Sequence, residues 1–499
     1  MNGPWLLGLD IGSSFIKAAL IDAASGTLVA RAAAPEREMT IRAPQPGWAE
    51  QDPEHWWSHA VRAARLALQE ANAPPGIVSA IGISYQMHGL VVVDRHLRVL
   101  RPAIIWCDGR AVGIGERAFA TIGPLSCLAR LLNSPGNFTA SKLAWVKEHE
   151  PATYAAIHKA MLPGDYLAMR LTGEATTTPS GLSEGVLWDF LDQTVSSDVL
   201  EALGLDPSLI CRQVPTFGVQ GELTAAAAAA LGLRPGIPVS YRAGDQPNNA
   251  FSLNVLEPGE VAATAGTSGV VYGVGCEARW DSASRVNTFL HVNHTPAVPR
   301  YGVLLCVNGT GSLNSWLNRT LGRNLSYDEM NRLAETAPVG SDGLTMLPFG
   351  NGAERTLGNR DPGASLFGLS FARHDLAHVC RAAQEGIVFA LNYGIDIMRE
   401  MGVDVRAVRA GRSNLFLSPL FARAFADTSG AAVELIDTDG AQGAARGAGV
   451  GVGVYATPAD AAIGLTACAR IEPDSTTRAR YREAYDRWLT ALRQHVLGA

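Results

Sequence analysis

Two short turns rich in glycine and hydroxyl side chains could bind phosphate. In the first, Asp10 closes an apolar run, and Gly12, Ser13 and Ser14 follow it. Glycine permits a tight backbone whose amides, together with hydroxyls, can surround phosphate oxygens. Mg²⁺ prefers one or two protein carboxylates beside phosphate oxygens, so Asp10 is a candidate metal ligand. An ordinary hairpin turn is the alternative for this segment taken alone.

A second turn of the same kind follows about half a chain later. Gly266, Thr267 and Ser268 separate the apolar run 261–265 from the apolar run 270–274. Because one such turn comes from each half of the chain, a phosphate could be held from two sides. This repetition favours phosphate binding over two unrelated hairpins.

Asp245 is the candidate general base. It follows Gly244 just after the apolar stretch 239–241, where a strand is expected to end. A carboxylate that accepts the proton of an attacking hydroxyl contributes about 10²–10⁴-fold to such a reaction. The alternative role of an aspartate after glycine is that of a turn or helix-cap residue.

Two loops carry side chains suited to sugar hydroxyls. Gln86 and His88, with Met87 between them, could line such a site, although a satisfied core histidine beside a packing methionine is the alternative. Trp106 could supply the apolar platform of a ligand pocket.

Asp108 and Arg110 follow the tryptophan on the same turn. Their charged groups could bind sugar hydroxyls, or the two side chains could pair with each other. The sequence leaves both alternatives open.

The elements that must position these residues alternate between strand and helix patterns. Apolar runs over 5–10, 15–21 and 27–32 predict an antiparallel meander, and apolar positions recur at helical spacing over 53–71. A further strand is expected over 77–84. This alternation indicates a layered α/β fold.

The repeated strand–turn–strand pattern predicts two related domains, at 1–253 and 254–499. The alanine run 225–230 predicts a surface helix. The small residues of 440–453 indicate either a closely packed helix or a backbone that lies against a flat ligand such as adenine.

Composition excludes several classes of function. The chain has 499 residues, of which 47% are hydrophobic and 18% charged, with a net charge of −6 and no long basic stripe. These values argue against a disordered chain, a nucleic-acid partner and a membrane-surface binder. With no apolar run approaching a membrane span and no basic leader, we expect a cytoplasmic protein.

Seven scattered cysteines lack the paired spacing of disulfide frameworks or zinc sites, so we expect reduced thiols buried as small hydrophobes. The chain also lacks a P-loop and the motif set of protein kinases. A kinase built on this sequence must therefore bind phosphate through another architecture, and the paired turns meet that requirement.

At this point the sequence resembles the FGGY carbohydrate kinases over nearly its whole length. The segments similar to that family are 46–53, 142–145, 162–166, 352–355 and 437–449, together with both turns and the Gly244-Asp245-Gln246 segment. The resemblance implies two ribonuclease-H-like (actin-like ATPase) domains with a deep interdomain cleft. It also implies that ATP and Mg²⁺ are used, with no nucleic-acid or membrane partner; a homodimer is left open.

The resemblance implies roles for individual residues as well. Asp245 becomes the catalytic base, and Asp10 and Asp245 the metal ligands. The implied sugar ligands are Gln86, Met87, His88, Trp106, Asp108, Arg110, Asp245 and Gln246. The implied nucleotide-binding residues are Gly12, Ser13, Ser14, Lys17, Gly266, Thr267, Ser268, Gly311, Gly411, Arg412 and Asn414.

Within the family, the loop 86–89 and the turn 106–110 are similar to the kinases that phosphorylate D-xylulose to D-xylulose 5-phosphate. The segment Arg242-Ala243-Gly244 departs from the glycine triplet common in that subgroup. Kinases of ribulose, glycerol or a deoxy-ketose are therefore alternatives. A non-enzymatic actin-like sensor is the alternative from another class, and such a protein would not need Asp245.

Overall fold

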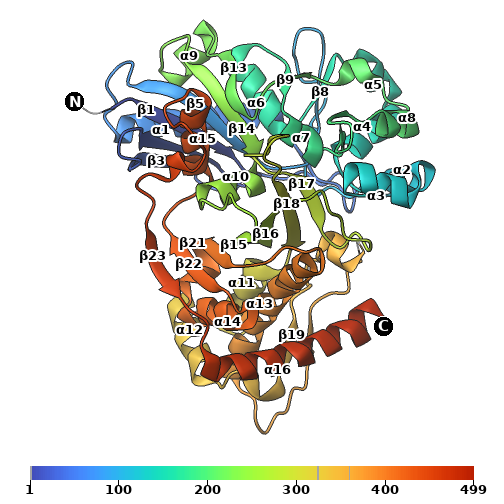
Figure 1. Cartoon of the computed structure of the whole chain (residues 1–499), viewed down its shortest axis with the longest axis vertical. Helices are drawn as coiled ribbons and strands as arrows, with labels where there is room; N and C mark the ends of the chain where they lie inside the picture. Colours follow the sequence, from blue (N-terminus) through green and yellow to red (C-terminus); the bar gives the residue numbers. More distant parts are fainter. Residues whose placement is uncertain (1–2, 323–324, 359, 499) are drawn as a thin grey trace.

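The computed structural model describes residues 3–322, 325–358 and 360–498 and contains one large β-sheet in each half of the chain (Figure 1). The first sheet has six strands in the order β13-β14-β5-β1-β2-β3. Their bounds are β1 Trp5–Ile11, β2 Ile16–Asp22, β3 Leu28–Ala34, β5 Val78–Tyr85, β13 Phe217–Glu222 and β14 Pro238–Gly244. The expected meander is confirmed, since β1, β2 and β3 pair antiparallel.

The second sheet has seven strands in the order β17-β18-β16-β15-β21-β22-β23. Their bounds are β15 Glu260–Ala265, β16 Gly269–Gly275, β17 Asn287–Leu290, β18 Tyr301–Val307, β21 Ala407–Gly411, β22 Ala432–Ile436 and β23 Ala467–Ile471. Each sheet contains three adjacent antiparallel strands, β1-β2-β3 and β15-β16-β18. The first strand of each set pairs parallel with a later one, β1 with β5 and β15 with β21. The two candidate phosphate turns thus join equivalent strands of two sheets built alike.

The helices surround these sheets. They are α1 Pro53–Glu70, α2 Val112–Ile122, α3 Pro124–Leu131, α4 Thr139–His149, α5 Pro151–Ala156, α6 Pro163–Thr172, α7 Pro179–Glu184, α8 Ser197–Leu203, α9 Ala225–Leu231, α10 Asp245–Ser252, α11 Thr310–Thr320, α12 Tyr327–Thr336, α13 Leu376–Glu400, α14 Pro419–Ser429, α15 Gly440–Gly451 and α16 Ser475–Leu492. Short strands are β4 Glu50–Gln51, β6 Val91–Val93, β7 Ala103–Ile104, β8 Lys159–Met161, β9 Thr176–Thr177, β10 Trp188–Asp189, β11 Thr194–Val195, β12 Arg212–Gln213, β19 Thr345–Leu347 and β20 Ser365–Phe367. None of the described helices is both long and apolar enough to cross a bilayer.

Helix α1 shows how local sequence sets an element. Asp52 caps it by accepting from the Glu54 amide, and Pro53 occupies its first turn, where a missing amide hydrogen costs nothing. Its buried face includes Trp56 and four alanines, whereas Trp57 is only half-buried. The buried face is therefore centred one residue earlier than the apolar spacing alone suggests. The alanine helix α9 is partly exposed, as expected.

Helix α15 comes from the C-terminal half but packs on the sheet of the N-terminal half. In Figure 1 it lies beside β1, β5 and β14, and all its residues from Gly440 to Gly449 are buried. A Cβ at Gly8 or Gly82 would overlap the backbone carbonyls of Ala441 and Ala444 respectively. The close-packing interpretation of this small-residue segment therefore describes the helix.

The two halves are also joined by a polar and apolar seam around β17. The Asn133 side chain donates to the Thr288 carbonyl at 2.7 Å and accepts from the Thr288 amide at 2.9 Å. One hydrophobic cluster contains buried residues of both halves, among them Phe138 and Phe289. The loop 133–138 thus lies directly against the second sheet.

All seven cysteines are free, as expected. Their predicted burial is correct for Cys127, Cys211 and Cys380 but wrong for Cys107, Cys276 and Cys468, which are exposed. These three lie outside the packed interior, so their small apolar character does not determine their place.

Candidate active site

Asp245 lies where the two halves meet, as the first residue of α10. Gly244 occupies the N-cap position, so the Asp245 carboxylate is not the helix cap. A Cβ at Gly244 would overlap the Glu184 carboxylate and approach Met87 Cγ to 2.6 Å. Glycine therefore lets β14 end beneath Met87 and turn Asp245 toward the junction.

Two carboxylates share this region. Burial raises the pKa of Asp245 to about 7, with a further rise from the Asp10 carboxylate, while Gln246 lowers it. Burial also raises the pKa of Asp10, although Lys17 and the Ser84 hydroxyl, which donates to Asp10 Oδ1 at 2.8 Å, lower it. A carboxyl group that titrates near neutral pH is suited to accept a proton during catalysis.

The first turn connects the predicted phosphate and sugar residues. The Gly12 amide closes the turn on the Phe15 carbonyl at 3.1 Å. The Ser13 carbonyl accepts from Gln51 Nε2 at 2.7 Å, and its hydroxyl accepts from Trp106 Nε1 at 3.4 Å. Gly12, Ser13, Ser14 and Trp106 are partly accessible, and Lys17 is exposed.

The second turn is held by the start of α11. The Gly266 carbonyl accepts from the Gly311 amide at 2.8 Å and from the Thr310 hydroxyl at 2.8 Å. A Cβ at Gly311 would overlap that carbonyl, so glycine allows the helix to begin there. The Asn414 amide nitrogen lies 3.4 Å from the place of a Cβ on Gly266. Three predicted nucleotide-binding residues thus lie together.

Both turns border Asp245. Cys306 pairs with Val270, just after the second turn, and its thiol donates to Asn308 Oδ1 at 3.4 Å. Burial raises the pKa of this thiol, and the carboxylates of Glu354 and Asp245 raise it further. On the other side, Asp10 is the carboxylate that acts on Asp245. That one turn from each half holds the same phosphate stays a prediction.

The remaining nucleotide candidates are placed differently. Thr267 is exposed. A Cβ placed on Gly411 would lie 3.5 Å from Ser413 Oγ. Arg412 lines a cavity of about 320 Å³ with Phe416, Leu417, Pro419, Ala422, Arg423, Leu435, Ala469 and Ile471. Within the described part of the chain, that lining includes neither Gly266 nor Asn414.

His88 is held on three sides. Its Nδ1 lies 2.8 Å from the Glu184 carbonyl, and its ring meets Phe138 edge-on at 4.5 Å and Phe289 at 5.4 Å. Burial lowers the pKa of His88 to about 3, so the ring is neutral. Its backbone has a φ of +61°, a conformation that favours glycine, so the surrounding contacts must hold it.

The neighbours of His88 on this loop are also enclosed. Gln86 and Met87 are 2% and 4% exposed, and the Gln86 amide donates to the Ile11 carbonyl at 2.8 Å. This backbone bond ties the loop to the strand that ends in the first turn. The loop 86–88 is therefore closely packed. Of its three residues, His88 is the one that is partly accessible.

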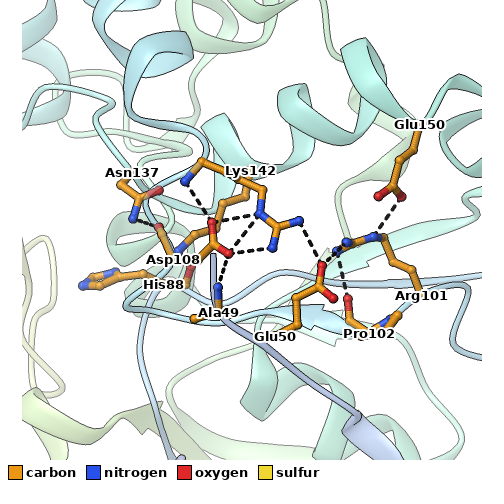
Figure 2. Close-up of polar contacts among 10 residues, drawn as sticks. Ala49, Glu50, His88, Arg101, Pro102, Asp108, Asn137, Lys142 and Glu150 are labelled. Atoms are coloured by element: carbon orange, nitrogen blue, oxygen red, sulfur yellow. Dashed lines mark hydrogen bonds and ion pairs between the residues drawn. The ribbon is translucent and has the colours of Figure 1, made fainter. Parts of the chain in front are cut away.

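Asp108 and Arg110 pair with each other. Figure 2 labels Asp108 beside Ala49 and Asn137. Asp108 accepts from the Ala49 amide at 2.5 Å and from Arg110 Nη2 at 2.6 Å, and its side chain is fully buried. Arg110 also pairs with Glu50 at 2.9 Å, while its own side chain is 1% exposed. This arrangement differs from the predicted sugar contact, because the charged atoms already have partners.

The Arg110 guanidinium lies against two tryptophans. Its central carbon is 3.8 Å from the Trp48 ring centroid and 4.8 Å from that of Trp145. The chain of charges continues from Glu50 to Arg101 and Glu150 at 2.7 and 2.9 Å (Figure 2). Stacked and bidentate contacts of this kind fix arginine geometry, so Arg110 holds the turn that carries Trp106.

Sequence reasoning missed Lys142 as a functional residue. Burial lowers its pKa to about 8, and its Nζ donates to the His88 carbonyl at 2.9 Å (Figure 2). It thereby supports the strained backbone of the predicted sugar loop. The sequence signal was its place in 142–145, one of the segments similar to the FGGY kinases, to which no role was given.

Glu184 was also missed. It is 1% exposed, burial raises its pKa well above the ordinary value, and Asp245 and Asp165 raise it further. Asp165, by contrast, accepts from the Leu162 amide at the start of α6 and pairs with Arg242 at 3.1 Å.

The carboxylates at the junction fit Mg²⁺ of the kind that enters with a nucleotide. Among the described residues, no group of three metal-ligating side chains is gathered. Mg²⁺ needs only one or two protein carboxylates when phosphates supply the other ligands. Burial is the main cause that raises the pKa of both groups, and a neighbouring carboxylate adds to it, Asp439 for Asp10 and Asp10 for Asp245. A bound cation would favour the ionised form of both.

Two sheets built alike, with equivalent turns facing one aspartate, define a two-domain protein of the actin-like ATPase fold. The chain matches the FGGY family of carbohydrate kinases, with the N-terminal domain over residues 5–252 and the C-terminal domain over residues 261–455. The chain therefore belongs to the FGGY family of carbohydrate kinases, and it is a phosphotransferase with an alcohol acceptor.

Individual relatives agree with this assignment. A xylulose kinase of Escherichia coli is 31% identical over 81% of this chain and 80% of its own. An L-xylulose/3-keto-L-gulonate kinase of the same organism is 30% identical over 100% and 97%. The crystal structure of xylulose kinase from Rhodospirillum rubrum has a TM-score of 0.87 at 28% identity, with 98% of each chain covered.

Proposed function

We propose that this protein transfers the γ-phosphate of ATP to D-xylulose, with Asp245 as the general base. The observation that carries the proposal is a half-buried aspartate with a pKa of about 7, at the start of a helix that contacts strands of both sheets. The xylulose kinases among its relatives support the choice of sugar.

The ketose lies against His88 and Trp106. Gln86 and Met87 pack behind His88. Asp245 accepts the proton of the attacking hydroxyl, and Gln246 beside it orients the same hydroxyl. Both turns donate backbone amides to the phosphates, which stabilises charge in the transition state more than in the ground state.

ATP lies on the second turn, where Gly266, Gly311 and Asn414 meet. Mg²⁺ held by Asp10 and Asp245 would neutralise charge on the transferred phosphoryl group. Lys17, across the hairpin from Asp10, supplies a further cation beside the first turn. Enclosure of the sugar by both halves excludes water, which would otherwise compete as the acceptor.

L-xylulose is a second candidate substrate. The L-xylulose/3-keto-L-gulonate kinase matches the chain end to end. In addition, Arg242, which replaces a glycine of the pattern common in xylulose kinases, is buried beside Asp165 just before the Asp245 turn. An arginine at position 242 could shift Asp245 and so change which sugar hydroxyl gives up its proton.

The test is an ADP-release assay with D-xylulose, L-xylulose, D-ribulose and glycerol. D-xylulose should give the highest kcat/KM, and Asp245→Asn should lower kcat about 10²–10⁴-fold. Asp404→Asn, at an exposed aspartate, is the matched control and should match the wild type. A higher kcat/KM for L-xylulose would select the second candidate, and near-normal turnover by Asp245→Asn would refute the mechanism.

A further inference from the structure

An arginine of the C-terminal half reaches into the sugar-side loop of the N-terminal half. Arg355 belongs to the 3-10 turn η3 Glu354–Leu357. Its Nη1 donates to the Ser134 hydroxyl at 2.5 Å, and its Nη2 donates to the Ser134 carbonyl at 2.6 Å. One guanidinium thus makes two charge-assisted hydrogen bonds to a single residue 221 positions away.

The loop that receives Arg355 is shaped around it. Gly136 has a φ of +40°, and a Cβ there would overlap Arg355 Nη2. The guanidinium carbon lies 4.6 Å from the centroid of the Phe138 ring, within the range of a cation–π contact. The cation is therefore surrounded by the hydroxyl and carbonyl of Ser134, the backbone of Gly136 and the ring of Phe138.

Phe138 connects this contact to the predicted sugar site. Its ring meets His88 edge-on at 4.5 Å, at an interplanar angle of 84°. The helix that begins directly after Phe138 carries Lys142, whose Nζ holds the His88 carbonyl. Arg355 thus contacts the beginning of the segment 134–142, and Lys142 lies at its end. This segment supports the strained backbone of His88.

The turn η3 packs against β18, which pairs with the strand that leaves the second turn. Its hydrogen bonds to Ser134 join it to the loop of the N-terminal half. A side chain of η3 can therefore couple the position of the second turn to that of the loop 134–138.

We propose that Arg355 is a positioning residue that clamps the loop 134–138 and thereby fixes the His88 wall for the sugar. This inference rests on the proposed function for its effect on sugar, but the clamp itself does not. The β17 seam joins the halves through the hydrogen bonds of Asn133 and Thr288, in which Arg355 takes no part. Loss of the clamp should therefore act locally and should not separate the halves.

The kinetic test compares Arg355→Ala, Ser134→Ala and their double variant with Arg360→Ala. Arg360 is an exposed arginine of the same loop whose Nε donates to the Leu357 carbonyl, so it is a matched control. Arg355→Ala should raise the KM for sugar at least about tenfold and change the KM for ATP less than about twofold. Ser134→Ala should have a smaller effect, and none in the Arg355→Ala background.

Hydrogen exchange followed by mass spectrometry tests the clamp without any activity. Amides of 134–142 should exchange at least about tenfold faster in Arg355→Ala than in the wild type or Arg360→Ala. Unchanged exchange overturns the clamp. An unchanged sugar KM, equal effects on both substrates, or additive effects of the two substitutions overturn the positioning role.

The two proposals can fail separately. If the wild type phosphorylates no sugar in the panel, the proposed function fails, and the exchange measurement alone decides whether Arg355 clamps the loop. If D-xylulose is phosphorylated and Arg355→Ala behaves as Arg360→Ala does, only the inference about Arg355 fails.

Discussion

Replacing Asp245 by asparagine should stabilise the protein at pH 8 while nearly abolishing phosphoryl transfer. The carboxyl group has an ordinary pKa of 3.8 but a pKa of about 7 in the fold, because burial and the Asp10 carboxylate oppose its ionisation. A roughly thousandfold change in proton affinity, at about 1.4 kcal/mol per tenfold, costs the ionised native state about 4 kcal/mol. Since Asp245 is partly accessible to water, we expect a gain of about 2–4 kcal/mol.

The sign of the pH dependence follows from proton binding. Between pH 3.8 and about 7 the folded state keeps a proton that the unfolded state has released. Rising pH therefore destabilises the wild type through this window, and the cost is constant once both states are ionised. The stabilisation by Asp245→Asn should be full above pH 7, about half as large at pH 5.5, and absent below the unfolded-state pKa.

Urea unfolding of the wild type, Asp245→Asn and Asp404→Asn at pH 5.5 and pH 8 measures this difference. In parallel, kcat/KM of the wild type should fall about tenfold per pH unit below pH 7, because protonated Asp245 cannot accept a proton. Equal stability gains at the two pH values would refute the assigned pKa. A wild-type rate that is flat from pH 6 to pH 8 would remove Asp245 as the titrating base.

Three further substitutions test the packing around the site. Gly8→Ala should destabilise the protein by about 3 kcal/mol or more in denaturant unfolding, because its Cβ would overlap the Ala441 carbonyl of α15. Gly113→Ala, in open space on helix α2, is the control and should be neutral or stabilising by up to about 1 kcal/mol. Arg110→Lys should raise the sugar KM at least about tenfold, because a lysine cannot replace the bidentate and stacked contacts; an unchanged KM would contradict the positioning role. Trp106→Phe removes the bond to the Ser13 hydroxyl and should lower kcat/KM about threefold to tenfold; a larger loss in stability than in rate would contradict this.

Much of the fold followed from local sequence because its determinants are local. Apolar runs of strand length, closed by Gly12 and Gly266, predicted both hairpins, and helical spacing over 53–71 predicted α1. Turn and cap chemistry depends on a few neighbouring residues, so the pattern was sufficient. The packing of α15 on the opposite sheet was not predicted, because small residues indicate close approach without naming the partner.

The sequence alone determined which residues could do chemistry: two phosphate-suited turns, one aspartate after glycine, and two polar loops. The tertiary structure decided their protonation and their partners. Burial and the nearby Asp10 carboxylate together raise the pKa of Asp245 to about 7. Arg110 pairs with Asp108 and Glu50, so its guanidinium does not bind the sugar. Burial, like-charge repulsion and long-range ion pairing depend on distances between residues far apart in the chain, and no local pattern contains those distances.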